Sequence, residues 1–90
     1  MFIWDETKRS ANLRKHGIDF MDAERIFGGF TLTAEDAQKA YGERRFLTLG
    51  LLADQVVSVV HTERDDDVRI ISIRKATKHE ALFYFSQVAD

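Results

Sequence analysis

The sequence predicts an α+β domain in which helices pack on one face of an antiparallel sheet. Two observations lead to this fold class. The first third of the chain places apolar residues at helical spacing between capping residues, and three later runs rich in β-branched and aromatic residues alternate with period two. The expected order is strand, helix, helix, three strands and helix, and 90 residues suffice for a single domain, 1–90.

The first third of the chain predicts one short strand and two helices. A strand is expected at Phe2–Trp4, followed by a polar helix that Asp5 caps and that runs to His16, with Gly17 ending it. A second helix is expected from Asp19 to Phe27, before a pair of glycines. Residues 30–33 are then expected to be extended, and 34–43 to form a polar loop.

The remainder predicts an antiparallel meander and a last helix. Arg44–Leu52, Val56–Arg64 and Val68–Lys75 are the three strand candidates, and the segments between them are short enough for hairpin turns. Thr77 and Glu80 stand at the spacing of a capping box, which predicts a helix from there towards the C-terminus.

Alternation along the meander divides its side chains between two faces. We expect the bulky face to pack against the helices; its members are Leu47, Leu49, Leu51, Val57, Val59, Ile71 and Ile73. The other face is expected to form a shallow groove; its members are Arg44, Phe46, Thr48, Gly50, Ser58, Val60, Thr62, Arg64, Ile70, Ser72 and Arg74. Arginines on a floor of small hydroxyl residues suit phosphate, because the planar guanidinium bonds two oxygens at once. The alternative is that Thr and Ser merely favour strands and the arginines are solvated.

His61 has two open orientations. Strict alternation turns it to the bulky face, as a buried and hydrogen-bonded histidine, whereas a one-residue bulge near Thr62 would turn it to the groove. Its ordinary pKa suits proton transfer near neutral pH, and we expect it to take part in the chemistry. A metal site formed by His61, His79 and Asp65 lacks any recognised ligand spacing and is set aside.

Composition excludes several classes of protein. There is no cysteine, hence no disulfide framework or thiolate metal site, and no apolar run approaches the length of a membrane span. No signal peptide is evident, so we expect a cytoplasmic protein without a membrane partner.

The net charge of −2 permits RNA binding without indicating it. Residues 61–80 contain five basic residues, which are Arg64, Arg69, Arg74, Lys75 and Lys78. They also contain five acidic ones, and the acidic run Asp65–Asp67 is expected to form a turn that holds it apart from the bases.

Several segments together resemble the BrnT toxin family, a branch of the RelE-like ribonuclease toxins. The matching pieces, in order, are Phe2–Asp5 with Lys8 and Asn12, Lys15–Gly17 with Phe20, Ala23–Phe27, Gly42–Phe46 with Gly50, Val59–Thr62 with Arg64, and Arg69–Ala76 with Glu80 and Tyr84. The resemblance covers nearly the whole chain and implies a single RelE-like toxin domain.

The resemblance also implies a function and partners. The chain would be the toxin of a type II toxin–antitoxin system, a metal-independent endoribonuclease that inhibits translation by cleaving RNA and uses no cofactor. A BrnA-like ribbon-helix-helix antitoxin would bind it in a hetero-oligomer, and operator DNA would be contacted only through that antitoxin. The alternative is a catalytically silent RelE-like binding module that serves only as antitoxin partner and co-repressor.

Residue roles follow from the same resemblance. The catalytic set would be His61, Arg64, Arg74 and Lys75, with the arginines stabilising the charge of the transition state and Lys75 or His61 moving protons. Arg69, Lys78 and Tyr84 would contact the RNA, with Tyr84 stacking on a base.

Overall fold

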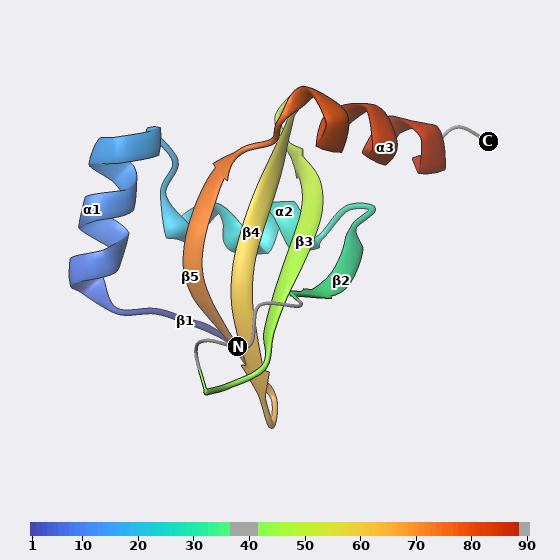
Figure 1. Ribbon diagram of the computed structural model, residues 1–90. Coiled ribbons are helices and arrows are strands. Elements are labelled where there is room, and N and C mark those ends of the chain that lie inside the picture. Colours follow the sequence, from blue (N-terminus) through green and yellow to red (C-terminus); the bar gives the residue numbers. More distant parts are fainter. Residues whose placement is uncertain (37–41, 89–90) are drawn as a thin grey trace.

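The computed structural model describes residues 1–36 and 42–88, which form one sheet with helices at its side, behind it and across its end (Figure 1). The elements are β1 (Phe2–Ile3), α1 (Glu6–His16), the 3₁₀ helix η1 (Phe20–Asp22), α2 (Ala23–Phe27), β2 (Leu32–Asp36), β3 (Arg45–Leu52), β4 (Gln55–Arg64), β5 (Asp67–Lys75) and α3 (Lys78–Val88). The predicted α+β class is confirmed. None of the described helices is long and apolar enough to cross a bilayer.

The sheet is larger than predicted. Its five strands lie in the order β1-β5-β4-β3-β2, so the expected meander β3-β4-β5 is flanked by the predicted first strand on one side and by an additional strand, β2, on the other. β1 pairs with β5 in parallel. β2 pairs antiparallel with β3 from Leu32 to Asp36, so the polar loop predicted for 34–43 is wrong over residues 34–36. The centre of β2 is exposed and lacks the apolar alternation that marks a strand in sequence. Residues 37–41 of that predicted loop lie outside the described residues.

Helix α1 forms at its predicted place and is fastened by a single buried side chain. An Asp5 carboxylate oxygen accepts hydrogen bonds from the amides of Thr7 and Lys8 at 2.8 and 3.2 Å, and Gly17 ends the helix in the left-handed region at φ 72°. Asn12 is its buried residue. The Asn12 amide donates to the carbonyls of Ile18 (3.1 Å) and Ile73 (2.9 Å) and accepts from the Ile73 amide at 3.1 Å. These bonds hold α1 against β5.

The pairing of β3 with β4 corrects the predicted faces. Thr48 lies opposite Val59 and Gly50 opposite Val57, and directly opposed residues project from the same side of a sheet. Thr48 and Gly50 therefore belong to the bulky face, and Leu49, opposite Ser58, belongs to the other. Alternation assigns faces within each strand, but the phase between strands depends on a pairing that the sequence pattern does not specify.

A β-bulge in β5 alters the alternation a second time. Val60 pairs with Ser72 and His61 with Ile70, so Ile71 is left over as the extra residue. Ile70 is consequently buried with the bulky residues instead of lying in the groove, while Arg69, Ser72 and Arg74 all project from the other face.

The two faces of the sheet have separate cores. We call the face bearing Val59 and Ile73 the back face; it is covered by η1 and α2 (Figure 1) and contains the larger cluster. The opposite, front face has a smaller cluster in which Tyr84 of α3 packs with Leu49 and Val56. α3 thus covers one end of the front face, so the expectation that the helices pack on one face of the sheet is wrong.

Candidate ribonuclease site

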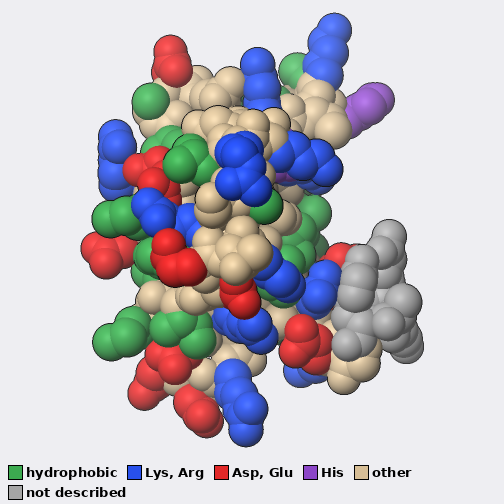
Figure 2. Space-filling model, turned by 90° about the vertical axis from the view of Figure 1, so that its left-hand side faces the viewer, with side chains coloured by type: hydrophobic (Ala, Val, Ile, Leu, Met, Phe, Trp, Pro, Cys, Tyr) green, Lys and Arg blue, Asp and Glu red, His purple; other side chains and the backbone are tan. Residues whose placement is uncertain are grey.

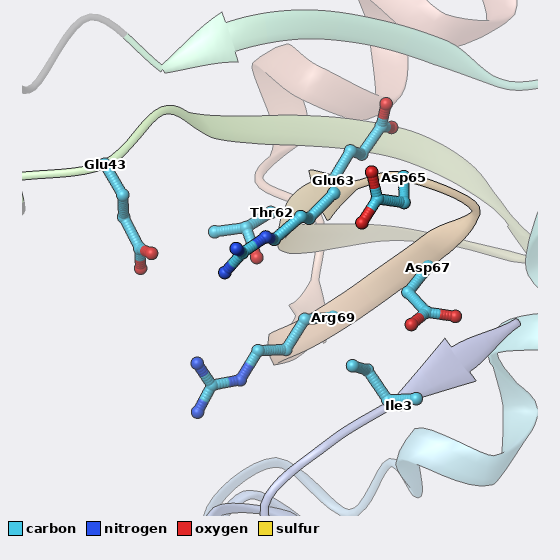
Figure 3. Close-up of a pocket in the computed structure, with 8 residues that line it drawn as sticks. Ile3, Glu43, Thr62, Glu63, Asp65, Asp67 and Arg69 are labelled. Atoms are coloured by element: carbon cyan, nitrogen blue, oxygen red, sulfur yellow. The ribbon is translucent and has the colours of Figure 1, made fainter.

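A pocket of about 580 Å³ opens at the end of the β4–β5 hairpin (Figure 3). Its lining residues are Ile3, Glu43, Thr62, Glu63, Arg64, Asp65, Asp67 and Arg69. Figure 3 shows Glu43, Thr62 and Arg69 around one space, with Asp65 and Asp67 nearer the turn. We call this the hairpin pocket.

Two arginines from adjacent strands provide its positive charge. Thr62 pairs with Arg69 and Arg64 with Asp67, which places all four on the front face. Arg64 and Arg69 are exposed, and neither makes an ion pair within residues 1–36 and 42–88. Their guanidinium groups are therefore available to phosphate oxygens.

The same pocket contains four carboxylates. Asp65 and Asp67 belong to the acidic run, which forms the predicted turn, with Asp65 at φ 58°. The expectation that this turn holds the acids apart from the bases is wrong, because both side chains line the pocket with Arg64 and Arg69. Two arginines against four acids leave the lining with a formal charge of −2, which disfavours binding of free RNA here by charge alone.

Arg74 lies in a different environment, bound to Glu80. Its two terminal nitrogens donate to the two Glu80 oxygens at 2.8 and 3.0 Å. The Arg74 guanidinium holds the pKa of Glu80 below its usual range, with a smaller lowering from the Thr77 amide. Glu80 also accepts from the Thr77 amide at 2.8 Å and its own amide donates to the Thr77 hydroxyl at 3.1 Å, so the predicted capping box is present.

The expected catalytic residues occupy two places. Arg69 pairs with Thr62 and Arg74 with Ser58, four residues away on β4, which at about 3.3 Å per residue separates the two arginines by about 13 Å along the sheet. Lys75 and Lys78 are exposed at the Arg74 end. The structure brings Arg64 and Arg69 together, but it does not bring Arg74 and Lys75 into the hairpin pocket.

His61 lies in the core. Its side chain is 0% exposed, on the back face, between the rings of Phe27 and Phe46 at centroid distances of 5.4 and 5.8 Å. Its Nε2 and the Thr48 hydroxyl are 2.7 Å apart, and burial lowers the pKa of the ring. The bulge that was to turn His61 outward lies on β5 instead, so the groove orientation is wrong and the ring cannot contact RNA in this conformation.

Tyr84 is likewise enclosed. It is 1% exposed and its hydroxyl donates to the Phe30 carbonyl at 2.7 Å, fastening α3 to the segment before β2. The ring therefore has no free face on which a base could stack.

Comparison with known proteins identifies the family. The family model described as the ribonuclease toxin BrnT of type II toxin–antitoxin systems matches residues 4–80. The chain belongs to the BrnT family. No curated protein sequence matches it. A BrnT toxin of a type II system has an antitoxin as partner, and the match includes both arginines of the hairpin pocket as well as Arg74 and Glu80.

One candidate residue of the hairpin pocket was not expected from the sequence. Glu43 was placed at the end of a polar loop, yet its carboxylate faces the space beside Thr62 and Arg69 (Figure 3). The sequence feature that could have indicated Glu43 is its position next to Arg44 and Arg45, just before a strand that pairs with β4. No group of three or more His, Asp or Glu side chains in the described part of the chain is arranged to hold a metal ion.

Proposed function

We propose that this BrnT-family toxin is a metal-independent endoribonuclease that arrests translation by cutting RNA in the hairpin pocket. The observation that carries the proposal is the pair of exposed guanidinium groups of Arg64 and Arg69, which make no ion pair with any described residue and line one pocket with the Glu43 carboxylate. Such a pair can bind the non-bridging oxygens of one phosphate and stabilise the charge of a pentacovalent transition state.

The reaction requires no metal-bound water, because the RNA carries its own nucleophile. The 2′-hydroxyl oxygen bonds to the adjacent phosphorus as Glu43 accepts its proton, and the bond from phosphorus to the 5′-oxygen breaks. The leaving oxygen takes a proton from solvent, so the products are a 2′,3′-cyclic phosphate and a 5′-hydroxyl end. Arg74, Lys75 and Lys78 lie too far along the sheet to act at this phosphate, and we assign them to flanking phosphates.

Cleavage of a labelled RNA by the antitoxin-free protein in EDTA tests the proposal. Cutting should persist, give cyclic phosphate ends, and fall by about 10²–10³ in Arg64→Ala or Arg69→Ala, since each removes a transition-state donor. Glu43→Gln should lower cleavage while RNA binding is retained. Arg14→Ala, which removes an exposed charge from α1 away from the pocket, serves as the control.

Two outcomes would overturn this mechanism. Cleavage lost in EDTA and restored by a divalent ion would show that a metal is required. No cleavage of any RNA by folded protein would favour the silent binding module, a reading that the four pocket carboxylates and the engagement of Arg74 by Glu80 support.

The partner proposal has its own test. A BrnA-like ribbon-helix-helix antitoxin would form a hetero-oligomer with this chain, and operator DNA would be bound through the antitoxin. Co-expression with the neighbouring gene product should give a co-purifying complex that binds the operator, whereas this chain alone should not. Expression without the antitoxin should arrest growth and protein synthesis.

A further inference from the structure

A second hollow, of about 250 Å³, lies between α1 and β5. Its lining residues are Lys8, Ala11, Asn12, Lys15, His16, Ile71 and Ser72. The helix side comes from consecutive turns of one face of α1, and the strand side comes from the bulge residue Ile71 and its neighbour. We call this the α1 pocket; Figure 2 views the molecule from the side on which α1 lies.

The charge of the α1 pocket is opposite to that of the hairpin pocket. Two lysines line it, and no Asp or Glu is among its lining residues. Neither lysine makes an ion pair with any described residue. In Figure 2, Lys and Arg side chains are spread over the middle of this face from its top to its bottom, with Asp and Glu side chains among them. Of the two pockets, this one favours an anion by its own charge.

The helix dipole does not account for Lys8. The helix dipole favours cations in the last turn, which explains Lys15 and His16, but it disfavours a cation in the first turn, where Lys8 stands. Lys8 and Lys15 are seven residues apart, about 10.5 Å along the helix, on the same side. They therefore form two positive points with Ala11 between them.

The floor between these points is apolar and held rigidly. Ala11 lies on the helix side and Ile71 on the strand side, and Asn12 beneath them uses its amide fully on Ile18 and Ile73. The volume is below the roughly 300 Å³ at which pockets for drug-sized ligands begin, so it suits one planar ring.

We propose that the α1 pocket binds one nucleotide of single-stranded RNA, with its base against Ala11 and Ile71 and the flanking phosphates at Lys8 and Lys15. The inference rests on the proposed ribonuclease function and adds a second contact to it. Ser72 pairs with Val60 and Arg69 with Thr62, two residues away on β4, so Ser72 and Arg69 lie about 7 Å apart on the same front face and a single strand reaches both pockets. RNA would thus be anchored on α1, where charge favours it, and cut beside the carboxylates.

Binding of a fluorescein-labelled 2′-O-methyl RNA, which cannot be cleaved, tests the proposal by anisotropy across a salt series. Lys8→Gln with Lys15→Gln should weaken binding by about tenfold and lower the salt slope by about 1.4, the loss expected for two single-strand phosphate contacts. Ala11→Leu should weaken binding several-fold with the salt slope unchanged, because it blocks the base and spares the phosphates.

Arg14→Gln with Arg25→Gln is the matched control. Both arginines are exposed and lie outside the α1 pocket, so the same two charges are lost with less than a twofold change in affinity. Thermal melting of every variant verifies that it is folded. A lysine variant that binds like this control would overturn the proposal.

Two further measurements separate this site from its alternatives. If the lysine variant loses affinity for the antitoxin and keeps it for RNA, the α1 pocket serves the protein partner and the nucleotide proposal is wrong. If the wild type binds 2′-O-methyl RNA through the lysines yet never cuts unmodified RNA, the ribonuclease proposal fails and this site stands. If the wild type and the lysine variant cut unmodified RNA equally, the ribonuclease proposal stands and the α1-pocket proposal fails.

Discussion

Asn12→Ala removes the side chain that fastens α1 to the sheet. Three buried backbone groups lose their partner, namely the carbonyl of Ile18 and both the amide and the carbonyl of Ile73. Each buried group left without a partner costs about 1 kcal/mol, the low end of the usual range, because the adjoining hollow admits water. The three groups together therefore lower the free energy of unfolding by about 3 kcal/mol. Alanine returns about 0.5 kcal/mol in helix propensity, leaving a net loss of about 2.5 kcal/mol.

Such a loss is large for a domain of this size, whose free energy of unfolding is about 5–13 kcal/mol. Thermal and urea unfolding measure it, and the melting temperature should fall by about 10–20 °C. Ser10→Ala, an exposed change in the same helix, is the control and should stay within about 0.5 kcal/mol of the wild type. Asn12→Asp should also destabilise, because a carboxylate would face two carbonyls. An Asn12→Ala protein that melts with the Ser10→Ala control would refute the reasoning.

Three other substitutions test separate parts of the structure. His61→Gln should lose about 1–3 kcal/mol of stability while RNA cleavage is retained. A folded variant that no longer cleaves RNA would show that the His61 ring takes part in the reaction. Burial lowers the pKa of His61 below its ordinary 6.5, so as the pH falls the ring binds a proton in the unfolded chain before it does in the folded one. The free energy of unfolding of the wild type should therefore fall as the pH drops below about 6.5, and His61→Gln should flatten that dependence. Gly50→Ala should cost about 1–3 kcal/mol, because its Cβ would lie 2.8 Å from a methyl group of α2, whereas Gly29→Ala, with open space around it, should be nearly neutral by the same unfolding measurement. Glu80→Gln should tighten RNA binding several-fold by releasing Arg74, and unchanged affinity in the anisotropy assay would show that the ion pair does not mask that cation.

Local features of the fold were predictable from sequence. The Asp5 cap, the Gly17 terminus and the Thr77–Glu80 capping box each depend on hydrogen bonds within a few residues, so residue types at fixed spacing reveal them. The hairpin turns after β3 and β4 are predictable for the same reason. β2 was missed because its exposed centre carries no apolar alternation.

The site was predictable only by residue type. Arginines were expected to meet phosphate, but which of them share a pocket depends on strand phase and on the bulge at Ile71, both set by distant packing. The buried state of Tyr84 depends on a bond to Phe30, 54 residues away, that no local pattern records. Arg74 and Glu80 are only six residues apart in the sequence, but one lies in a strand and the other in a helix, so no regular spacing predicts their ion pair.

The bulge also makes β5 tolerant of losing one residue. Ile70 and Ser72 already lie opposite neighbouring residues of β4, so deleting Ile71 would restore uninterrupted pairing and leave every other residue of β5 opposite its present partner. Arg69 would stay on the same face as Arg74, and Ile70 would stay in the interior. A single-residue deletion in a strand would thus spare both cationic positions while it removes one wall of the hollow beside α1.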